Sequence, residues 1–259
     1  MGNIFSFDEI QIFTFFLTLL RMSAFVVSWP VFGVPMVPSP AKILFGVVLS
    51  MLMFPIVEAQ GLALAMSIEN MVWLSMKEVF IGLSIGFLAR MFFFAISIGG
   101  QTISVSMGLS ASQLYNPALG EQSTTVDQLY IALASLFFLA INGHHIFLSG
   151  LVTSYELVPI GPGLLSAQAF SNFGQIMQQV MTVGVMLSAP VMISVLFSNL
   201  AMAVIGRAVP QINVLITSLP INILLGILVM IVTVPLLLTQ MHDILHQTAE
   251  RLFAYLKAL

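Results

Sequence analysis

Six apolar blocks constrain this chain more than any other feature of its sequence. A helix needs about 20 apolar residues to cross a bilayer. By that rule the blocks cover residues 10–29, 41–57, 71–96, 129–152, 176–205 and 214–238. Only 7% of the 259 residues are charged, whereas a soluble domain carries roughly 25%. The sequence therefore predicts an all-α polytopic membrane protein.

The composition also excludes several classes of function. The chain has no cysteine and a net charge of −3 without a basic cluster, so it offers neither thiolate chemistry nor a surface for nucleic acid. It contains no P-loop or GxGxxG motif, and these are the motifs that would indicate nucleotide or dinucleotide chemistry. We expect no enzyme activity, no cofactor and no metal site.

A polar stretch at residues 97–127 separates the third block from the fourth. It reads SIGGQTISVSMGLSASQLYNPALGEQSTTVD and is rich in Gly, Ser, Thr, Gln and Asn. In hydrocarbon, irregular backbone survives only where protein buries it or where it lines a watery cavity. The stretch is therefore either an extramembrane loop or a segment that lines or plugs a passage.

The charged residues inside the apolar blocks include Arg21, Glu78 and Arg90. Glu78, Gly82, Gly86 and Arg90 are spaced by four and share one helical face, and a GxxxG pair lets another helix approach closely. Glu78 and Arg90 are about 18 Å apart along a helix and cannot pair with each other. Each needs a partner from another segment or another chain. The glycines serve either packing within this chain or a subunit interface.

Other polar and helix-breaking positions give local predictions. Lys77 is expected to reach water or headgroups by snorkelling, and a helix break is expected around Asn142–Gly143. Pro190 and Pro235 lie inside the fifth and sixth blocks, which we expect to be broken or bent. From Gln240 onward, apolar residues recur at helical spacing, which indicates an amphipathic tail.

Four motifs carry a resemblance to a known family. They are GLSIGFLARMFFFAISIGGQTISVSMGLS at 82–110, NPALG at 116–120, FLAINGHH at 138–145 and IGRAVPQINVLITSLPINILLG at 205–226. Together they resemble the export-gate subunits of type III secretion, a family shared by flagella and virulence injectisomes. The resemblance covers nearly the whole chain, and it departs at Asn116, where many relatives have Asp.

The resemblance implies a non-enzymatic subunit of a protein-export channel in the bacterial inner membrane, within the flagellar basal body. It implies long, broken and kinked helical hairpins packed as one subunit of a helical gate, with part of the assembly raised out of the bilayer plane. Residues 1–173 would be a P-subunit-like region with the plug at about 97–127, and 174–259 a Q-subunit-like hairpin with the amphipathic tail. The implied partners are P-type and Q-type gate subunits, the B-type switch subunit, the large A-type export subunit, unfolded protein substrates and membrane lipid.

The resemblance also implies roles for individual residues. The plug would include Met107, Gly108, Leu109, Ser110, Tyr115, Asn116, Pro117 and Gly120. Arg21, Glu78, Gly82, Gly86 and Arg90 would serve helix packing or subunit contacts, with Glu78 and Arg90 paired to neighbouring subunits. A cytoplasmic-side turn would contain Arg207, Pro210, Gln211, Asn213 and Pro220.

Two other functions fit the composition. A secondary transporter for a small solute would also have broken helices and intramembrane charges, often in two related halves, but no internal repeat is visible. An intramembrane enzyme would use His144 or His145. Neither alternative accounts for the run at 205–226.

Overall fold

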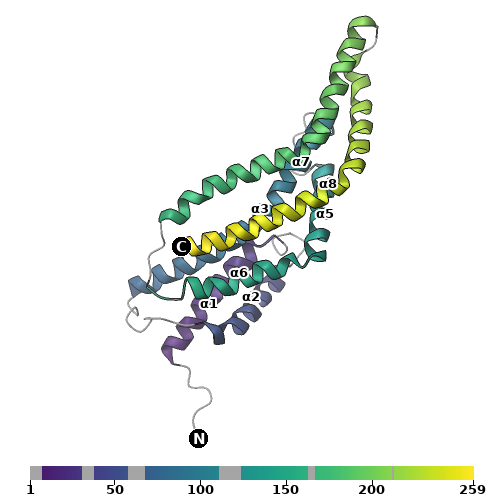
Figure 1. Ribbon diagram of the computed structural model, residues 1–259. Helices are drawn as coiled ribbons and strands as arrows, with labels where there is room; N and C mark the ends of the chain where they lie inside the picture. The colour runs from purple at the N-terminus through teal and green to yellow at the C-terminus, as the bar shows by residue number, and fades with distance from the viewer. Residues whose placement is uncertain (1–7, 31–37, 58–67, 111–123, 163–166, 212) are drawn as a thin grey trace. The chain divides into compact units, whose positions relative to one another are not determined.

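A computed structural model describes residues 8–30, 38–57, 68–110, 124–162, 167–211 and 213–259 (Figure 1). These residues form α-helices and one short 3₁₀ turn, which confirms the all-α prediction. The elements are α1 Glu9–Ser28, α2 Ser39–Met53, η1 Phe54–Ile56, α3 Ile68–Met107, α5 Thr125–Ala140, α6 Gly143–Leu157, α7 Ala167–Ala208 and α8 Val214–Ala258.

Several of these helices are long and apolar enough to cross a bilayer. Within the described ranges there are five, at Glu9–Ser28, Ser39–Ile56, Ile68–Met107, Gly174–Ala208 and Ile216–Ala258. A sixth arises if α5 and α6, which meet at an angle of 69°, count as one bent span. The chain is a polytopic membrane protein by this measure.

The residues pack into two compact units. The first contains residues 1–91, 142–175 and 247–259, and the second contains residues 92–141 and 176–246. Because α3, α7 and α8 each supply residues to both, the units alternate along the chain. The predicted division at residue 173 rests on resemblance to two kinds of subunit and stays a prediction.

In the first unit, α1 packs against α2 and the first part of α3. Its buried positions follow helical spacing, with Leu17, Phe25 and Val26 fully enclosed. Gly46 of α2 lies against Ser23, where a side chain on the glycine would make ordinary contact.

In the second unit, the latter part of α7 and the first part of α8 run side by side as a helical hairpin (Figure 1). Hydrogen bonds of 2.8 Å join them, from Ser198 Oγ to Asn222 Oδ1 and from Asn222 Nδ2 to Asn199 Oδ1. The polar groups satisfy one another, so the hairpin can keep apolar side chains on its outer faces. Phe92 and Phe138 pack together where α3 meets α5.

The helix of the third apolar block is longer than the sequence predicted. The block ends at residue 96, yet α3 continues to Met107 and takes in the first third of the polar stretch. Its hydroxyl groups bond to carbonyls one turn back, as Thr102 Oγ1 does to Ile98 and Ser106 Oγ to Thr102. Since the helix satisfies these side chains itself, the polar composition does not end it.

Breaks in the other blocks occur at one expected place and not at others. Asn142 adopts a left-handed conformation, with φ 56°, between α5 and α6, which confirms the predicted break. By contrast, α7 continues through Pro190 and α8 through Pro220 and Pro235, but both helices are bent along their length, as predicted (Figure 1). Each proline removes one backbone donor from a helix of more than 40 residues, and the flanking turns keep theirs. The amphipathic tail is confirmed as the end of α8.

Candidate functional site

The polar stretch leaves α3 through a well-defined helix end. Gly108 has φ 82°, its N–H donates to the Val105 carbonyl at 3.1 Å, and the Leu109 N–H donates to the Ser104 carbonyl at 3.0 Å. This pair of hydrogen bonds is a Schellman motif, which needs the left-handed conformation that glycine adopts without strain. The chain direction at Met107–Leu109 is therefore fixed, and Ser110 follows in the turn.

The far end of the stretch is capped as well. The Thr124 hydroxyl accepts a hydrogen bond of 3.3 Å from the Asp127 N–H, and the Thr124 carbonyl accepts one of 3.0 Å from Gln128. Threonine at this position satisfies a donor that the first turn of α5 would otherwise leave open.

The two helices that bound the stretch touch at the backbone. A side-chain carbon placed on Gly100 would lie 2.7 Å from the Cα of Asp127, so only glycine fits there. Beside it, Gln101 Nε2 donates to Asp127 Oδ2 at 3.3 Å. The polar stretch thus begins and ends on a pair of helices that are packed together.

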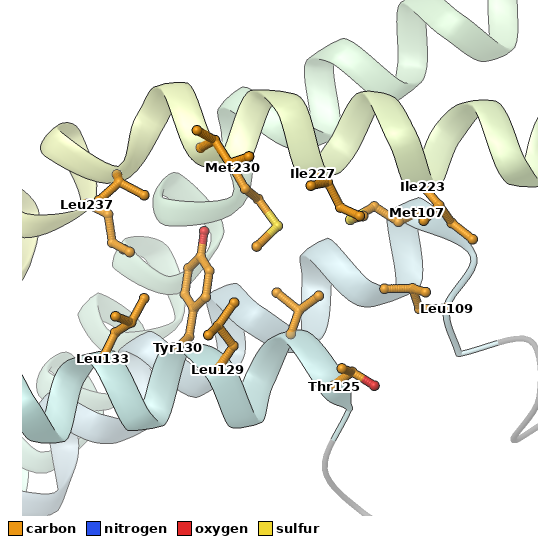
Figure 2. Close-up of a pocket in the computed structure, with 13 residues that line it drawn as sticks. Met107, Leu109, Thr125, Leu129, Tyr130, Leu133, Ile223, Ile227, Met230 and Leu237 are labelled. Carbon is orange, nitrogen blue, oxygen red and sulfur yellow. The ribbon is translucent and has the colours of Figure 1, made fainter.

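An apolar cavity of about 500 Å³ lies next to this contact between α3 and α5. Figure 2 shows Leu129 and Leu133 of α5 pointing toward Ile227 and Met230 of α8, with Met107 at one end. Met107 is fully buried, and its sulfur would lie 2.6 Å from a side-chain carbon on Gly226. The thioether occupies the space that the missing side chain of Gly226 leaves.

The remaining predicted plug positions are outside the described residues. These are Tyr115, Asn116, Pro117 and Gly120. Of the predicted plug residues, the structure therefore describes Met107, Gly108, Leu109 and Ser110, and it brings the first three together at the end of α3.

A second polar site lies in the first unit, around Arg21 and Glu78. The Arg21 Nε donates to Glu78 Oε2 at 2.5 Å, and neither side chain is exposed. Arg21 also donates to the carbonyls of Ser154 and Val158, at 3.1 and 3.0 Å, and its guanidinium stacks 4.1 Å from the ring centre of Tyr155. One arginine thus joins α1, α3 and the end of α6.

Lys77 adds a second cation to this site. The prediction that it reaches water or headgroups is wrong, because Lys77 is only 5% exposed and its Nζ donates to the Gly161 carbonyl at 3.1 Å. The site holds two cations and one carboxylate. The excess positive charge lies at the carbonyl end of α6, where the helix dipole is negative.

The expected subunit contact of Glu78 is corrected by this pairing. Its partner is Arg21 of the same chain, which sequence spacing could not indicate because 57 residues separate them. Arg90 is half-buried, and no hydrogen bond or ion pair joins it to another described residue. A contact with a neighbouring subunit stays a prediction for Arg90.

The glycines of α3 also meet a partner in the same chain. A side-chain carbon on Gly82 would overlap the carbonyl oxygen of Arg21, and one on Gly86 would overlap the Ser28 hydroxyl. The two glycines therefore let α1 and α3 approach until backbone meets backbone. This close contact places the Arg21 and Glu78 side chains beside each other.

The predicted turn at the hairpin tip lies between α7 and α8, but Pro220 lies inside α8 and not in the turn. Arg207, Pro210 and Gln211 are exposed, and the Asn213 side chain accepts a hydrogen bond of 3.4 Å from Ile216 N at the start of α8. Gly206 faces Val214 across the turn. Arg207 lies in the last turn of α7, where a cation complements the helix dipole.

The sequence alone did not single out the residues that complete these sites. Ser154 and Tyr155 surround Arg21, and Asn222 links α7 to α8. The only signal for them was indirect, because a buried cation or amide in an apolar helix requires acceptors somewhere in the fold.

The fold and these sites define a polytopic helical membrane protein with a polar segment anchored between two packed helices. A family profile for bacterial export proteins, family 1, matches residues 12–248. The flagellar biosynthetic protein FliR of Bacillus subtilis is 30% identical over 245 residues, which cover 91% of this chain and 92% of that protein. The proteins of the same name from Escherichia coli and Aquifex aeolicus are 27% and 25% identical, over 86% and 91% of this chain and 85% and 91% of theirs. The chain belongs to family 1 of the bacterial export proteins.

Proposed function

We propose that this chain is a membrane subunit of the flagellar protein-export gate, in which residues 97–127 plug the passage for unfolded proteins. The family match over residues 12–248 carries the proposal, together with relatives named as flagellar biosynthetic proteins. The proposed location is the bacterial inner membrane, within the flagellar basal body.

The anchoring of the polar stretch supports a plug. A plug needs a base that stays in place and a tip that can leave the passage. The Schellman motif at Gly108 and the backbone contact between Gly100 and Asp127 supply such a base. Small side chains and satisfiable backbone groups suit the lining of a narrow watery constriction. The proposed tip includes Tyr115, Asn116, Pro117 and Gly120.

The exposed surface of the α7–α8 hairpin supports partners in the membrane. Phe197, Val204 and Val232 are 66%, 70% and 77% exposed, so lipid or other apolar helices must cover them. The proposed protein partners are P-type, Q-type, B-type and A-type export subunits, with Arg90 at a subunit contact. In this assembly residues 1–173 resemble a P-type subunit and 174–259 a Q-type hairpin, with the hairpin tip, from Arg207 in α7 to Pro220 in α8, at the cytoplasmic entrance.

Native mass spectrometry of the chain, purified from its own membranes in mild detergent, tests the assembly. A hetero-oligomer containing one copy of this chain among several small hydrophobic subunits is the expected result. A monomer or a homodimer would contradict the gate and would turn attention to the transporter, with Arg90 as a candidate ion-coupling residue.

Shortening the polar stretch tests the plug separately. Deletion of residues 112–117 should make membranes that contain the assembled gate leak ions, because the passage loses its closure. Deletion of six residues from another connection, 60–65, is the matched control and should leave the membrane tight. If the gate still assembles after the first deletion and the membrane does not leak ions, the polar stretch is a passive linker and not a plug.

A further inference from the structure

The apolar cavity of the second unit is lined almost entirely by hydrocarbon. Its wall residues come from the end of α3, from α5 and from α8, and the only oxygen-bearing side chains among them are Thr125 and Tyr130. In Figure 2 the side chains of α5 and α8 face one another across open space. Among the residues that the structure describes, no charged side chain lines the cavity.

Water is a poor occupant for such a cavity. A buried water needs two to four polar partners, and genuinely empty cavities are those with apolar linings. An empty space of this volume also forfeits the dispersion contacts of its lining. Because α8 is a candidate bilayer span, the hydrocarbon nearest to this opening is lipid.

The size of the cavity distinguishes between a lipid tail and a helix. One leaflet is about 15 Å deep, half of the hydrocarbon core, so a volume of about 500 Å³ drawn out over that depth has a cross-section of about 30 Å². An α-helix with its side chains is about 10–12 Å across and needs roughly 80–110 Å². The space suits a single extended chain and is too narrow to enclose a helix.

We propose that this cavity is a binding site for one acyl chain of a membrane phospholipid, held between α5 and α8 beside the end of α3. The acyl chain supplies the packing that is missing between Leu133 and Ile227, and it contacts the buried Met107. This inference does not depend on the flagellar function, because it rests only on the cavity and on the apolar helices around it.

The lining also predicts what the site does not recognise. Among the described residues of the second unit, the basic side chains are Arg207 at the hairpin tip and the histidines near the end of α8, and the cavity wall contains none of them. An anionic headgroup therefore gains no ion pair at the wall. Zwitterionic and anionic phospholipids should occupy the site equally well.

Photolabelling of the full chain in lipid nanodiscs tests the proposal. The probe is phosphatidylcholine with a diazirine in one acyl chain, and labelled peptides are mapped by mass spectrometry. Label is expected on residues 125–133 and 223–237. Moving the diazirine along the acyl chain should shift the label in order along α5 and α8.

Variants that fill the cavity from either wall sharpen the test. Ile227→Trp and Leu133→Trp should each lower labelling of the cavity about tenfold or more, because each displaced methylene costs about fourfold in affinity. Val232→Trp is the matched control, since Val232 is 77% exposed on α8 and does not line the cavity. It should leave the label unchanged.

Three outcomes would overturn the proposal. The first is label spread evenly over the exposed face of α8, and the second is cavity label that survives both filling variants. The third, in gate complexes purified from native membranes, is a partner-subunit peptide cross-linked at the cavity in place of lipid. If neither variant folds, as judged by helicity and elution, the ordered shift of label in the unmodified chain decides. A clear preference for phosphatidylglycerol over phosphatidylcholine would overturn the headgroup inference.

Discussion

The Nε of Arg21 lies 2.5 Å from Oε2 of Glu78, and both side chains are completely buried. The pair joins α1 to α3 within the first unit, and the remaining donors of Arg21 reach carbonyls at the end of α6. Three helices from distant parts of the sequence thus meet at one guanidinium. Since a buried charge is tolerated only when it is paired and hydrogen-bonded, this unit depends on the complete set.

Removal of Arg21 should destabilise the chain severely. Arg21→Met leaves the Glu78 carboxylate buried without its partner, at an expected cost of about 3–5 kcal/mol in the free energy of unfolding. Denaturant unfolding of the purified protein in mixed micelles measures it. Glu69→Gln is the control, because Glu69 is an exposed carboxylate on α3, the helix that carries Glu78. Equal losses in the free energy of unfolding in the two variants would show that the Arg21–Glu78 ion pair does not stabilise the fold.

The double variant Arg21→Met with Glu78→Leu should be more stable than Arg21→Met alone. An apolar pair of similar volume avoids the uncompensated charge. The same unfolding measurement gives the coupling energy. If the losses in the free energy of unfolding simply add, the two residues act independently. That result would contradict the ion pair seen in the structure.

Gly82→Ala should disrupt the contact of α1 with α3. The new methyl group overlaps the Arg21 carbonyl, which is backbone and cannot rotate away. The expected loss is about 1–3 kcal/mol, typical of overpacking. Gly174→Ala provides the comparison, since no heavy atom lies within 4 Å of its added carbon. It should be neutral or stabilise α7 by up to about 1 kcal/mol.

Gly108→Ala should weaken the end of α3. Its φ of 82° costs a residue with a Cβ about 1–2 kcal/mol, and the added methyl group would lie 2.6 Å from a methyl carbon of Leu219. Amide hydrogen exchange at Val105–Met107 should become faster. Gly108→Asn should be milder, because asparagine tolerates the left-handed conformation better. Identical exchange in both variants would exclude a role for the Schellman motif.

Asn222→Ala should loosen the α7–α8 hairpin by about 0.5–2 kcal/mol, the range of polar contacts between membrane helices. The variant removes both the acceptor of Ser198 and the donor to Asn199. A double-mutant cycle with Ser198→Ala isolates the first bond. A coupling energy of zero would mean that the hairpin is held by apolar packing alone.

The polar stretch shows which structural features the sequence could predict and which it could not. Its Gly, Ser and Thr content marked residues 97–127 as unlike the surrounding blocks, but composition could not show that residues 97–107 are helical. The hydroxyls of Thr102 and Ser106 bond within their own helix, so the same residues that suggested a loop are compatible with a helix. The break at Asn142 was easier to predict, since asparagine before glycine favours a left-handed turn.

The class of this protein, the approximate positions of its helices and the face that α3 presents could be predicted from the sequence. These follow from hydrophobic length and from periodicity, which are local properties of the chain. The groups that the buried charges contact became known from the folded chain. Arg21 reaches Glu78 across 57 residues and Ser154 across 133, and Lys77 reaches Gly161 across 84. Pairings at such separations are set by how the helices pack, because a buried charge takes whichever acceptor the packing brings within reach.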